Sequence, residues 1–205
     1  MAKNFAEIGF SAAAKKLQEK HGSRKTYSRM ESQTTYSGLG NHEQSFIAQR
    51  DSFYMATSGE NGFPYIQHRG GPKGFLKVLD ENRLGFIDFK GNMQYISVGN
   101  LMTNNKVSLF MVDYPNKRRL KLYAKAEIVE LKDNPELLQN LDLEDYKFQP
   151  ERMMVFNIEA FDWNCPQHIT PRFTVEEVEE ALKPQYEHIK NLEAEIAELK
   201  AKLGL

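Results

Sequence analysis

The middle of the chain is a series of short apolar runs separated by turn-forming residues. Aromatic and branched residues are concentrated in seven runs, at Ser52–Thr57, Pro64–Arg69, Phe75–Leu79, Arg83–Asp88, Lys106–Asp113, Leu120–Leu131 and Met153–Trp163. The connections, such as SGENG and DEN, have turn compositions, and connections this short are typical of antiparallel hairpins. Between 120 and 126 every second residue is apolar, which predicts a strand with one solvated face. About six or seven such strands with few helices between them predict a closed or nearly closed antiparallel barrel.

Helical periodicity is found at the two ends of the chain. Phe5, Ile8, Ala12 and Leu17 recur at helical spacing between residues 4 and 20, and Gly22 follows as a stop signal. Residues 32–42 are rich in Ser, Thr, Gly and Asn, which predicts a loop. We therefore expect an N-terminal helix and loop at 1–31, a barrel domain at 32–173 and a helical tail at 174–205.

The tail carries a seven-residue repeat. Thr174 and Glu177 form a capping box, which starts a helix. Apolar residues then occupy every seventh position from 175 to 203. A second series, at 178, 185, 192 and 199, lies three residues further along the chain, and Gln185 is its only polar member. This pattern predicts a coiled-coil seam. Pro184 predicts a kink or break, with a second helix starting near it. The apolar stripe needs a partner, which is either the chain's own domain or another chain.

Charge and cysteine content limit the classes of function. The chain has 205 residues, with 27 Lys and Arg against 28 Asp and Glu, a net charge of −1 and one cysteine. A nearly neutral chain lacks the clustered positive charge that drives general nucleic-acid binding, so we expect no nucleic-acid partner. A single cysteine excludes an intramolecular disulfide and favours a reducing compartment. No run approaches the roughly 20 apolar residues that span a bilayer, so we expect a soluble cytoplasmic protein without a membrane partner.

Two glycine-containing segments of the barrel have the composition of an anion site. In QHRGGPKGFLKV, residues 67–78, cationic side chains are interleaved with glycines that permit close backbone approach. In DFKGNMQYISVGN, residues 88–100, hydrogen-bonding side chains precede a helix start, where exposed N–H groups attract phosphate. The segments could share one phosphate, although ordinary turns and caps use the same residues. Neither segment contains a Walker loop or a dinucleotide fingerprint.

A third segment, DWNCPQHITPRF at 162–173, follows the last strand. It contains the only Trp, the only Cys, a His and an Arg, together with two prolines. Cys165 and His168 lack an orienting third partner, and a lone Cys is usually a small buried hydrophobe, so nucleophilic catalysis is not expected. One such pair also falls short of the four ligands of a structural zinc site, and we expect no metal. Gln167 and Arg172 suit recognition of carbonyl oxygens or an anion.

Taken in order, these segments resemble the pyridoxamine 5′-phosphate oxidase-related family of FMN-binding split barrels. The similarity runs from about Leu39 to Phe173 and rests on LGNHEQSFIAQRDSFYMATSGENGFPYIQHRGGPKGFLKVLDENRLGFIDFKGNMQYISVGNL and DWNCPQHITPRF. It implies a mainly β fold (β+α) with a six-stranded antiparallel split β-barrel, and a homodimer with FMN at the subunit interface. It also implies a phosphate end formed by Arg69, Asn92, Gln94 and Ser97, a ring and ribityl part lined by Gln67, His68, Asp88 and Phe89, and a contribution from the partner chain by Gln167 and Arg172.

The chain departs from the pyridoxamine phosphate oxidases proper at two places. Those enzymes hold the phosphate with an Arg-Lys pair after the fourth strand, where this chain has Tyr95, Ile96 and Ser97. They also end in a basic, substrate-binding tail, whereas this chain ends in EIAELKAKLGL. We therefore expect the phosphate to be held differently and the substrate to differ from vitamin B6.

The function expected from the resemblance is that of an FMN-dependent oxidoreductase acting on a small organic molecule. In such proteins the cofactor performs the redox chemistry, so no catalytic His or Cys is required. Phe53, Tyr54, Phe75, Phe86 and Phe89 could form an apolar slot for the flavin ring, or they could form the barrel core. Two other functions remain open. One is binding or storage of a flavin, deazaflavin or haem without turnover, and the other is an interaction scaffold that uses the C-terminal helix.

Overall fold

The structure, a computed structural model of the chain, describes residues 4–33 and 37–204. Within these residues the helices are α1 (Phe5–Gly9), α2 (Ala12–Lys20), α3 (Arg24–Gln33), α4 (Asn41–Ala48), α5 (Ile96–Thr103), α6 (Pro135–Leu141) and α7 (Val175–Leu203). The strands are β1 (Ser52–Ser58), β2 (Pro64–Gly70), β3 (Lys77–Asp80), β4 (Arg83–Phe89), β5 (Lys106–Asp113), β6 (Arg118–Val129) and β7 (Pro150–Trp163). None of the described helices is long and apolar enough to cross a membrane.

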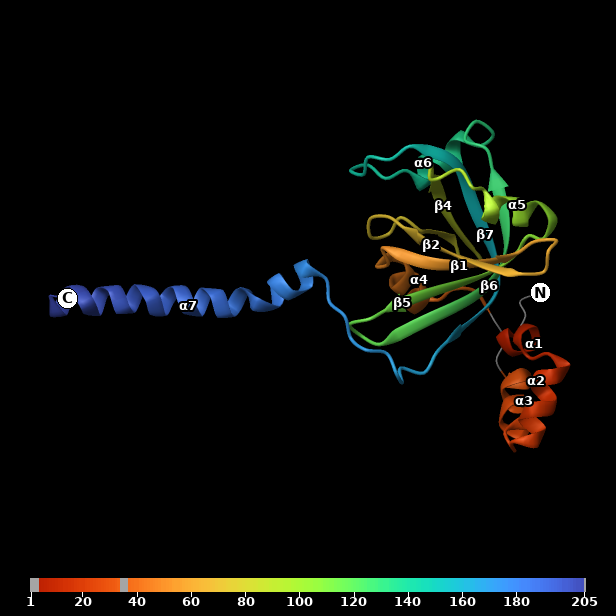
Figure 1. The fold of residues 1–205 in the computed structure, drawn as a ribbon, viewed down its shortest axis with the longest axis horizontal. Coiled ribbons are helices and arrows are strands. Elements are labelled where there is room, and N and C mark those ends of the chain that lie inside the picture. Colours follow the sequence, from red (N-terminus) through yellow and green to blue (C-terminus); the bar gives the residue numbers. More distant parts are fainter. Residues whose placement is uncertain (1–3, 34–36, 205) are drawn as a thin grey trace. The chain divides into compact units, whose positions relative to one another are not determined.

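All seven strands form one antiparallel sheet in the order β2-β1-β5-β6-β7-β4-β3 (Figure 1). The predicted β+α fold class of the split-barrel type is therefore confirmed, with seven strands in the sheet instead of six. The sheet is not closed, because β2 and β3 lie at its two edges and have no strand partner on their outer sides.

The open sheet curls until its two ends approach each other. Strands β2 and β4 are five places apart in the strand order, yet the Arg69 side chain of β2 forms an ion pair with Asp88 of β4. Helix α5, which follows β4, is tied to the other end of the sheet by two hydrogen bonds. Ser97 Oγ donates to Gln67 Oε1 of β2 at 2.7 Å, and Asn100 Nδ2 donates to Thr57 Oγ1 of β1 at 3.0 Å. Polar side chains thus bridge the split between the two ends.

The core inside the curled sheet is aromatic and aliphatic. The rings of Phe53, Phe75, Phe86 and Phe156 contact one another with centroid separations between 5.4 and 6.1 Å, and all four are buried. The alternation predicted for 120–126 is observed, because its apolar members on β6 are all buried. Of the rings considered for a flavin slot, Phe53, Phe75 and Phe86 therefore belong to the core.

The N-terminal region contains more helix than its apolar pattern predicted. The helix expected from residue 4 to residue 20 is divided in two, because Asn4 and Ser11 each accept a hydrogen bond from a backbone N–H and so begin α1 and α2 separately. Helix α3 was not predicted, and it is anchored by ion pairs from Glu31 to Lys15 of α2 and to its own Arg24. The loop predicted at 32–42 is interrupted at both ends by α3 and α4, and its residues 34–36 lie outside the described part of the chain.

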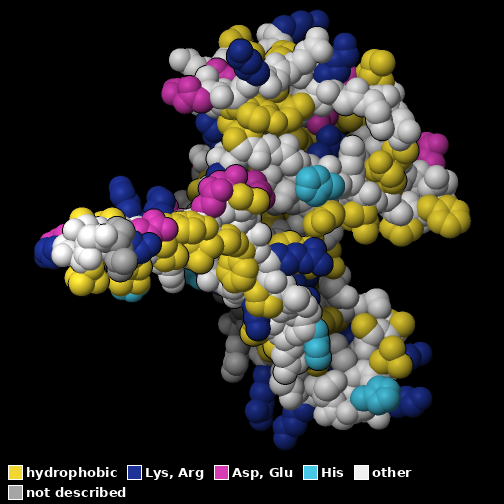
Figure 2. Space-filling view, turned by 60° about the vertical axis from the view of Figure 1, so that its left-hand side comes forward, with side chains coloured by type: hydrophobic (Ala, Val, Ile, Leu, Met, Phe, Trp, Pro, Cys, Tyr) yellow, Lys and Arg dark blue, Asp and Glu magenta, His cyan; other side chains and the backbone are white. Residues whose placement is uncertain are grey.

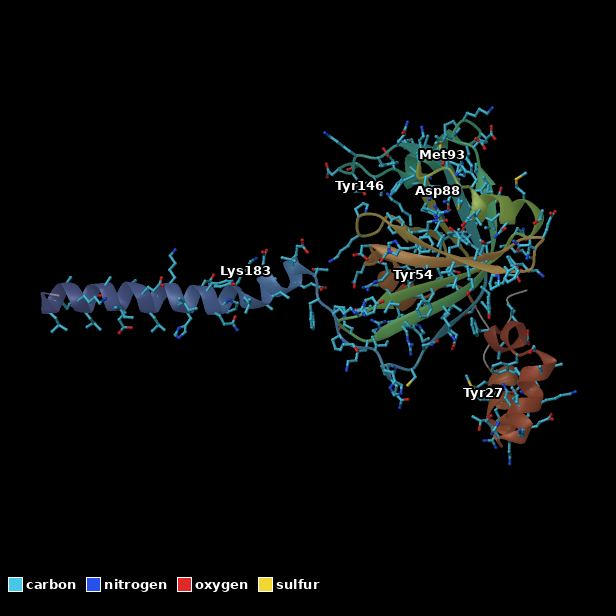
Figure 3. The ribbon with its side chains drawn as sticks, in the orientation of Figure 1. Tyr27, Tyr54, Asp88, Met93, Tyr146 and Lys183 are labelled. Carbon is cyan, nitrogen blue, oxygen red and sulfur yellow. The ribbon has the colours of Figure 1, made fainter. Side chains whose placement is uncertain are left out.

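The chain divides into two compact units, one comprising Met1–Asp113 and Arg118–Pro166, and the other comprising Tyr114–Lys117 and Gln167–Leu205. Helix α7 belongs to the second unit and begins with the predicted capping box, in which Glu177 N donates to Thr174 Oγ1 at 3.2 Å and Thr174 N donates to Glu177 Oε2 at 2.8 Å. Of the kink or break predicted at Pro184, the break is not observed, since the helix continues through it. The ribbon bends near Lys183 (Figure 3), which is how a helix accommodates an internal proline without ending.

Candidate functional site

The split in the sheet contains a buried pair of charges. Arg69 of β2 donates through a terminal guanidinium N–H to Asp88 Oδ1 of β4, and the two side chains are only 13% and 3% exposed. Burial lowers the pKa of Arg69, against the opposing effect of Asp88, but an arginine so paired stays charged. Its Nε–H is buried without a partner among the described residues. Arg69 therefore keeps one N–H, that of Nε, for which the described residues provide no acceptor.

A second arginine completes the pairing of Asp88. Arg152 lies opposite Asp88 in the β4–β7 register, and its Nη1 donates to Asp88 Oδ2 at 2.9 Å. The same guanidinium contacts Glu151, with Nη1 at 3.1 Å from Oε2 and Nη2 at 2.9 Å from Oε1. Burial lowers the pKa of Arg152, but the hydrogen bonds to Asp88 and Glu151 more than compensate and raise it overall. The two arginines and two carboxylates have no net formal charge.

Tyr95 connects this quartet to the loop after β4. Its hydroxyl donates to Glu151 Oε1 at 2.7 Å, and the Arg152 guanidinium carbon lies 5.3 Å from the centre of the Tyr95 ring. The shared hydrogen bond raises the pKa of the Tyr95 phenol and lowers the pKa of Glu151, because it stabilises the neutral phenol and the charged carboxylate.

The loop between β4 and α5 presents the start of α5 to the same place. Met93 and Tyr95 have φ values of 59° and 54°, in the left-handed region that residues other than glycine seldom occupy. Tyr95 is the N-cap residue of α5, and no side chain caps the helix there. The first N–H groups of α5 are therefore available to an acceptor, and a helix N-terminus favours an anionic one.

These elements enclose a cavity of about 220 Å³. Figure 3 shows Asp88 and Met93, two of its lining residues, at the same end of the sheet. The lining is mostly polar and comprises Tyr65, Gln67, Arg69, Asp88, Phe89, Gly91, Asn92, Met93, Gln94, Tyr95, Ile96, Ser97, Val98, Glu151 and Arg152. An anion in the cavity could accept hydrogen bonds from the Arg69 guanidinium, from side-chain amides and from the first backbone N–H groups of α5.

Most of the residues suggested by the sequence lie around this cavity. Those that line it are Gln67, Arg69, Asp88, Phe89, Asn92, Gln94 and Ser97. His68 does not, because side chains alternate along a strand and it lies on the outer face of β2, where its ring is 5.4 Å from that of Tyr54. Gln167 and Arg172 belong to the other compact unit, where the Arg172 guanidinium carbon is 5.0 Å from the Tyr114 ring centre.

Tyr65, Glu151 and Arg152 line the cavity but were not among the predicted residues. The sequence carries no clear signal for Arg152, because residues of both alternations of β7 are buried from Met153 to Phe156. The Cys165 thiol is exposed, and no cluster of three metal-ligating side chains occurs within the described ranges.

Comparisons with known proteins agree with this architecture. The family model described as pyridoxamine 5′-phosphate oxidase matches residues 39–162, more than half of the chain. HupZ of Group A Streptococcus superposes with a TM-score of 0.50 at 14% identity, over 66% of this chain and 100% of that chain. This likeness concerns the fold alone.

Two further solved structures are similar at lower scores. An FMN-binding protein from Syntrophomonas wolfei matches with a TM-score of 0.48 at 14% identity, over 72% of this chain and 97% of that chain. A protein related to general stress protein 26 from Clostridium acetobutylicum, of the pyridoxinephosphate oxidase family, matches with a TM-score of 0.42 at 21% identity, over 67% and 94% of the two chains. No curated protein matches. On the extent of the family match, the chain belongs to the pyridoxamine 5′-phosphate oxidase family.

Proposed function

We propose that this protein binds FMN, with the phosphate in the cavity at the split, and acts as an oxidoreductase on a small organic molecule. The observation that carries the proposal is the buried Arg69, which Asp88 holds in place while its Nε–H has no partner. A buried donor without an acceptor is costly, and a phosphate oxygen would supply the missing acceptor.

The donors around the cavity fit a phosphate. Arg69 has an Nε–H without a partner, and the uncapped start of α5 has backbone N–H groups. Arg152 is already bonded to Asp88 and Glu151, so its role here is to position Asp88. Arg69 thus replaces the Arg-Lys pair that the family's oxidases proper use after the fourth strand.

The size of the cavity supports a site completed by a second chain. Pockets for drug-sized ligands usually have roughly 300 to 1,000 Å³, whereas this one has about 220 Å³. It suits the phosphate and part of the ribityl chain, and the flavin ring needs further walls. We propose that a homodimer supplies them, with Gln167 and Arg172 of the partner subunit reaching the ring, and with Phe89 at the inner edge of the site.

The flavin, when bound, supplies two-electron redox chemistry, and the protein supplies binding, orientation and electrostatics. In this chain Asp88 holds Arg69 and is itself positioned by Arg152, while the hydrogen bond from Ser97 to Gln67 fixes the start of α5 to β2. These contacts fix the anion-binding groups on strands and on a helix instead of on a flexible loop.

An absorption spectrum and an FMN titration test the proposal. We expect the wild-type protein to bind FMN and Arg69→Ala to weaken that binding by about 2 to 5 kcal/mol, the cost of truncating one partner of a buried charged contact. Arg69→Lys keeps the positive charge but loses the planar set of guanidinium donors, so its FMN affinity should lie between those of the wild type and Arg69→Ala. Arg83→Ala is the matched control, since Arg83 forms an exposed ion pair with Asp80. This variant should bind FMN with the affinity of the wild type.

The outcomes separate the possible functions. Equal FMN affinity of Arg69→Ala and wild type would refute the phosphate site. A bound flavin that NADH or NADPH cannot reduce would indicate storage instead of turnover. A haem spectrum, or no ligand even after incubation with FMN, would overturn the flavin assignment.

A further inference from the structure

The C-terminal helix carries an apolar stripe that its own unit leaves uncovered. None of the described side chains of α7 is buried. Large apolar residues along it are exposed to between 36% at Leu182 and 72% at Leu203. Figure 2 shows these side chains in a row along the helix, with charged side chains beside them. The 29 residues of α7 give a length of about 43 Å at 1.5 Å per residue.

The stripe has the spacing of a two-helix seam. Residues 175, 182, 189, 196 and 203 occupy one heptad position, a, and residues 178, 185, 192 and 199 occupy the second, d. The a series contains Val175, Ile189 and Ile196, which are β-branched, while the last two members of the d series are leucines. Among parallel coiled coils, β-branched residues at a with leucine at d favour two strands.

We propose that α7 pairs with α7 of a second copy of this chain, in parallel and in register. Gln185 supports this choice of orientation and register. In a parallel pair Gln185 lies opposite the same residue of the second copy, where two amides can hydrogen-bond to each other. An antiparallel pair aligned over its full length places Gln185 opposite Ile196, and this happens twice, leaving two amides against apolar side chains. Seams use polar positions of this kind to fix their register.

The charges beside the seam are complementary in the parallel arrangement. Across such a pair, position g of one helix faces position e five residues further along the other. Glu195 then faces Lys200 of the second copy, and this pair occurs twice by symmetry. Pro184 falls at position c, on the outside of the pair, so its ring does not enter the seam.

Cross-linking of the full chain tests the orientation. In a background of Cys165→Ser, we expect Leu199→Cys at position d to form a disulfide-linked dimer under mild oxidation, because the two copies of residue 199 face each other. In an antiparallel pair the two thiols are 17 residues apart along the seam, or roughly 25 Å, and cannot bond. The control is Ala201→Cys, which is two residues away at the outward position f and should cross-link at least about ten times more slowly.

A charge exchange provides the second test. In the full chain, Lys200→Glu should lower the rate of cross-linking through residue 199, because Glu195 then faces a like charge. Adding Glu195→Lys should restore the rate. In an antiparallel pair Lys200 faces Glu179, so Glu195→Lys would rescue nothing. Failure of residue 199 to cross-link, equal rates for residues 199 and 201, or failure of the rescue would each overturn the proposal. The proposal does not depend on flavin binding, since these measurements need no ligand.

Discussion

Replacing Asp88 by Asn should destabilise the protein strongly, because this carboxylate joins the two ends of the sheet. Asp88 is 2% exposed and accepts hydrogen bonds from Arg69 on β2 and Arg152 on β7. Asparagine has nearly the same size but no charge, so the substitution leaves two buried guanidiniums without their shared counter-ion. Removing one partner of a buried ion pair costs about 3 to 5 kcal/mol, which is a large part of a typical total stability of about 5 to 15 kcal/mol.

Asp80→Asn is the matched control for this experiment. Asp80 pairs with Arg83 at 2.6 Å, but the side chains are 42% and 53% exposed. An exposed pair contributes about 0 to 1 kcal/mol. The same chemical change should therefore have a small effect at residue 80 and a large one at residue 88.

Urea unfolding followed by fluorescence of Trp163, the only tryptophan, measures the difference. With a slope of about 2 kcal/mol per molar urea, Asp88→Asn should lower the midpoint by about 1.5 to 2.5 M, and Asp80→Asn by less than about 0.5 M. Arg69→Gln combined with Asp88→Asn should cost less than the sum of the single changes, since the charges are coupled. Equal midpoints for the two asparagine variants would refute the view that buried charges hold the split together.

Two other predictions concern the surroundings of the split. The hydrogen bond from Tyr95 lowers the pKa of Glu151 below its ordinary value of 4.5. The stabilisation from this pair should therefore be present above pH 4.5 and be lost as the pH falls through the folded-state pKa. When the free energy of unfolding is measured against pH, Glu151→Gln should lose this part of the pH dependence, and a curve equal to that of the wild type would contradict the linkage. In Gly59→Ala the new Cβ would overlap the Asn100 carboxamide and break its bond to buried Thr57, so the melting experiment should show a loss of about 1 to 3 kcal/mol, whereas Gly91→Ala, which has open space around it, should melt like wild type.

Local pattern was sufficient to predict the strands, the capping box of α7 and two segments, 67–78 and 88–100, that contribute residues to the cavity. Alternation and heptad spacing are properties of consecutive residues, and both were visible without any tertiary information. Helix α3 was missed because its sequence, RKTYSRMESQ, has only two large apolar residues, Tyr27 and Met30, and contacts of Glu31 with Lys15 and Arg24 support it instead. The sequence could not show which side of β2 faces the cavity, and His68 lies on the side opposite to Gln67 and Arg69.

Arg152 illustrates the part of the site that depends on strand pairing. It is 64 residues from Asp88 in sequence and meets it only because β7 pairs with β4 in one particular register. The contact between Arg69 and Asp88 is less predictable still, because β2 and β4 are distant in strand order and meet only when the sheet curls. Curl and register are decided by the whole sheet, so no local pattern records them.

The equal numbers of positive and negative groups around the cavity also determine whether the protein needs a ligand in order to fold. Arg69 and Arg152 are already neutralised by Asp88 and Glu151, so the chain can reach its folded form before any anion arrives. Zinc fingers are the opposite case, in which folding waits for the metal. A ligand entering here adds stability to a finished fold, by about 1.4 kcal/mol for each tenfold rise in its free concentration above the dissociation constant. The fraction of protein with bound ligand then depends on the free ligand concentration, and the protein without ligand stays folded and able to bind it.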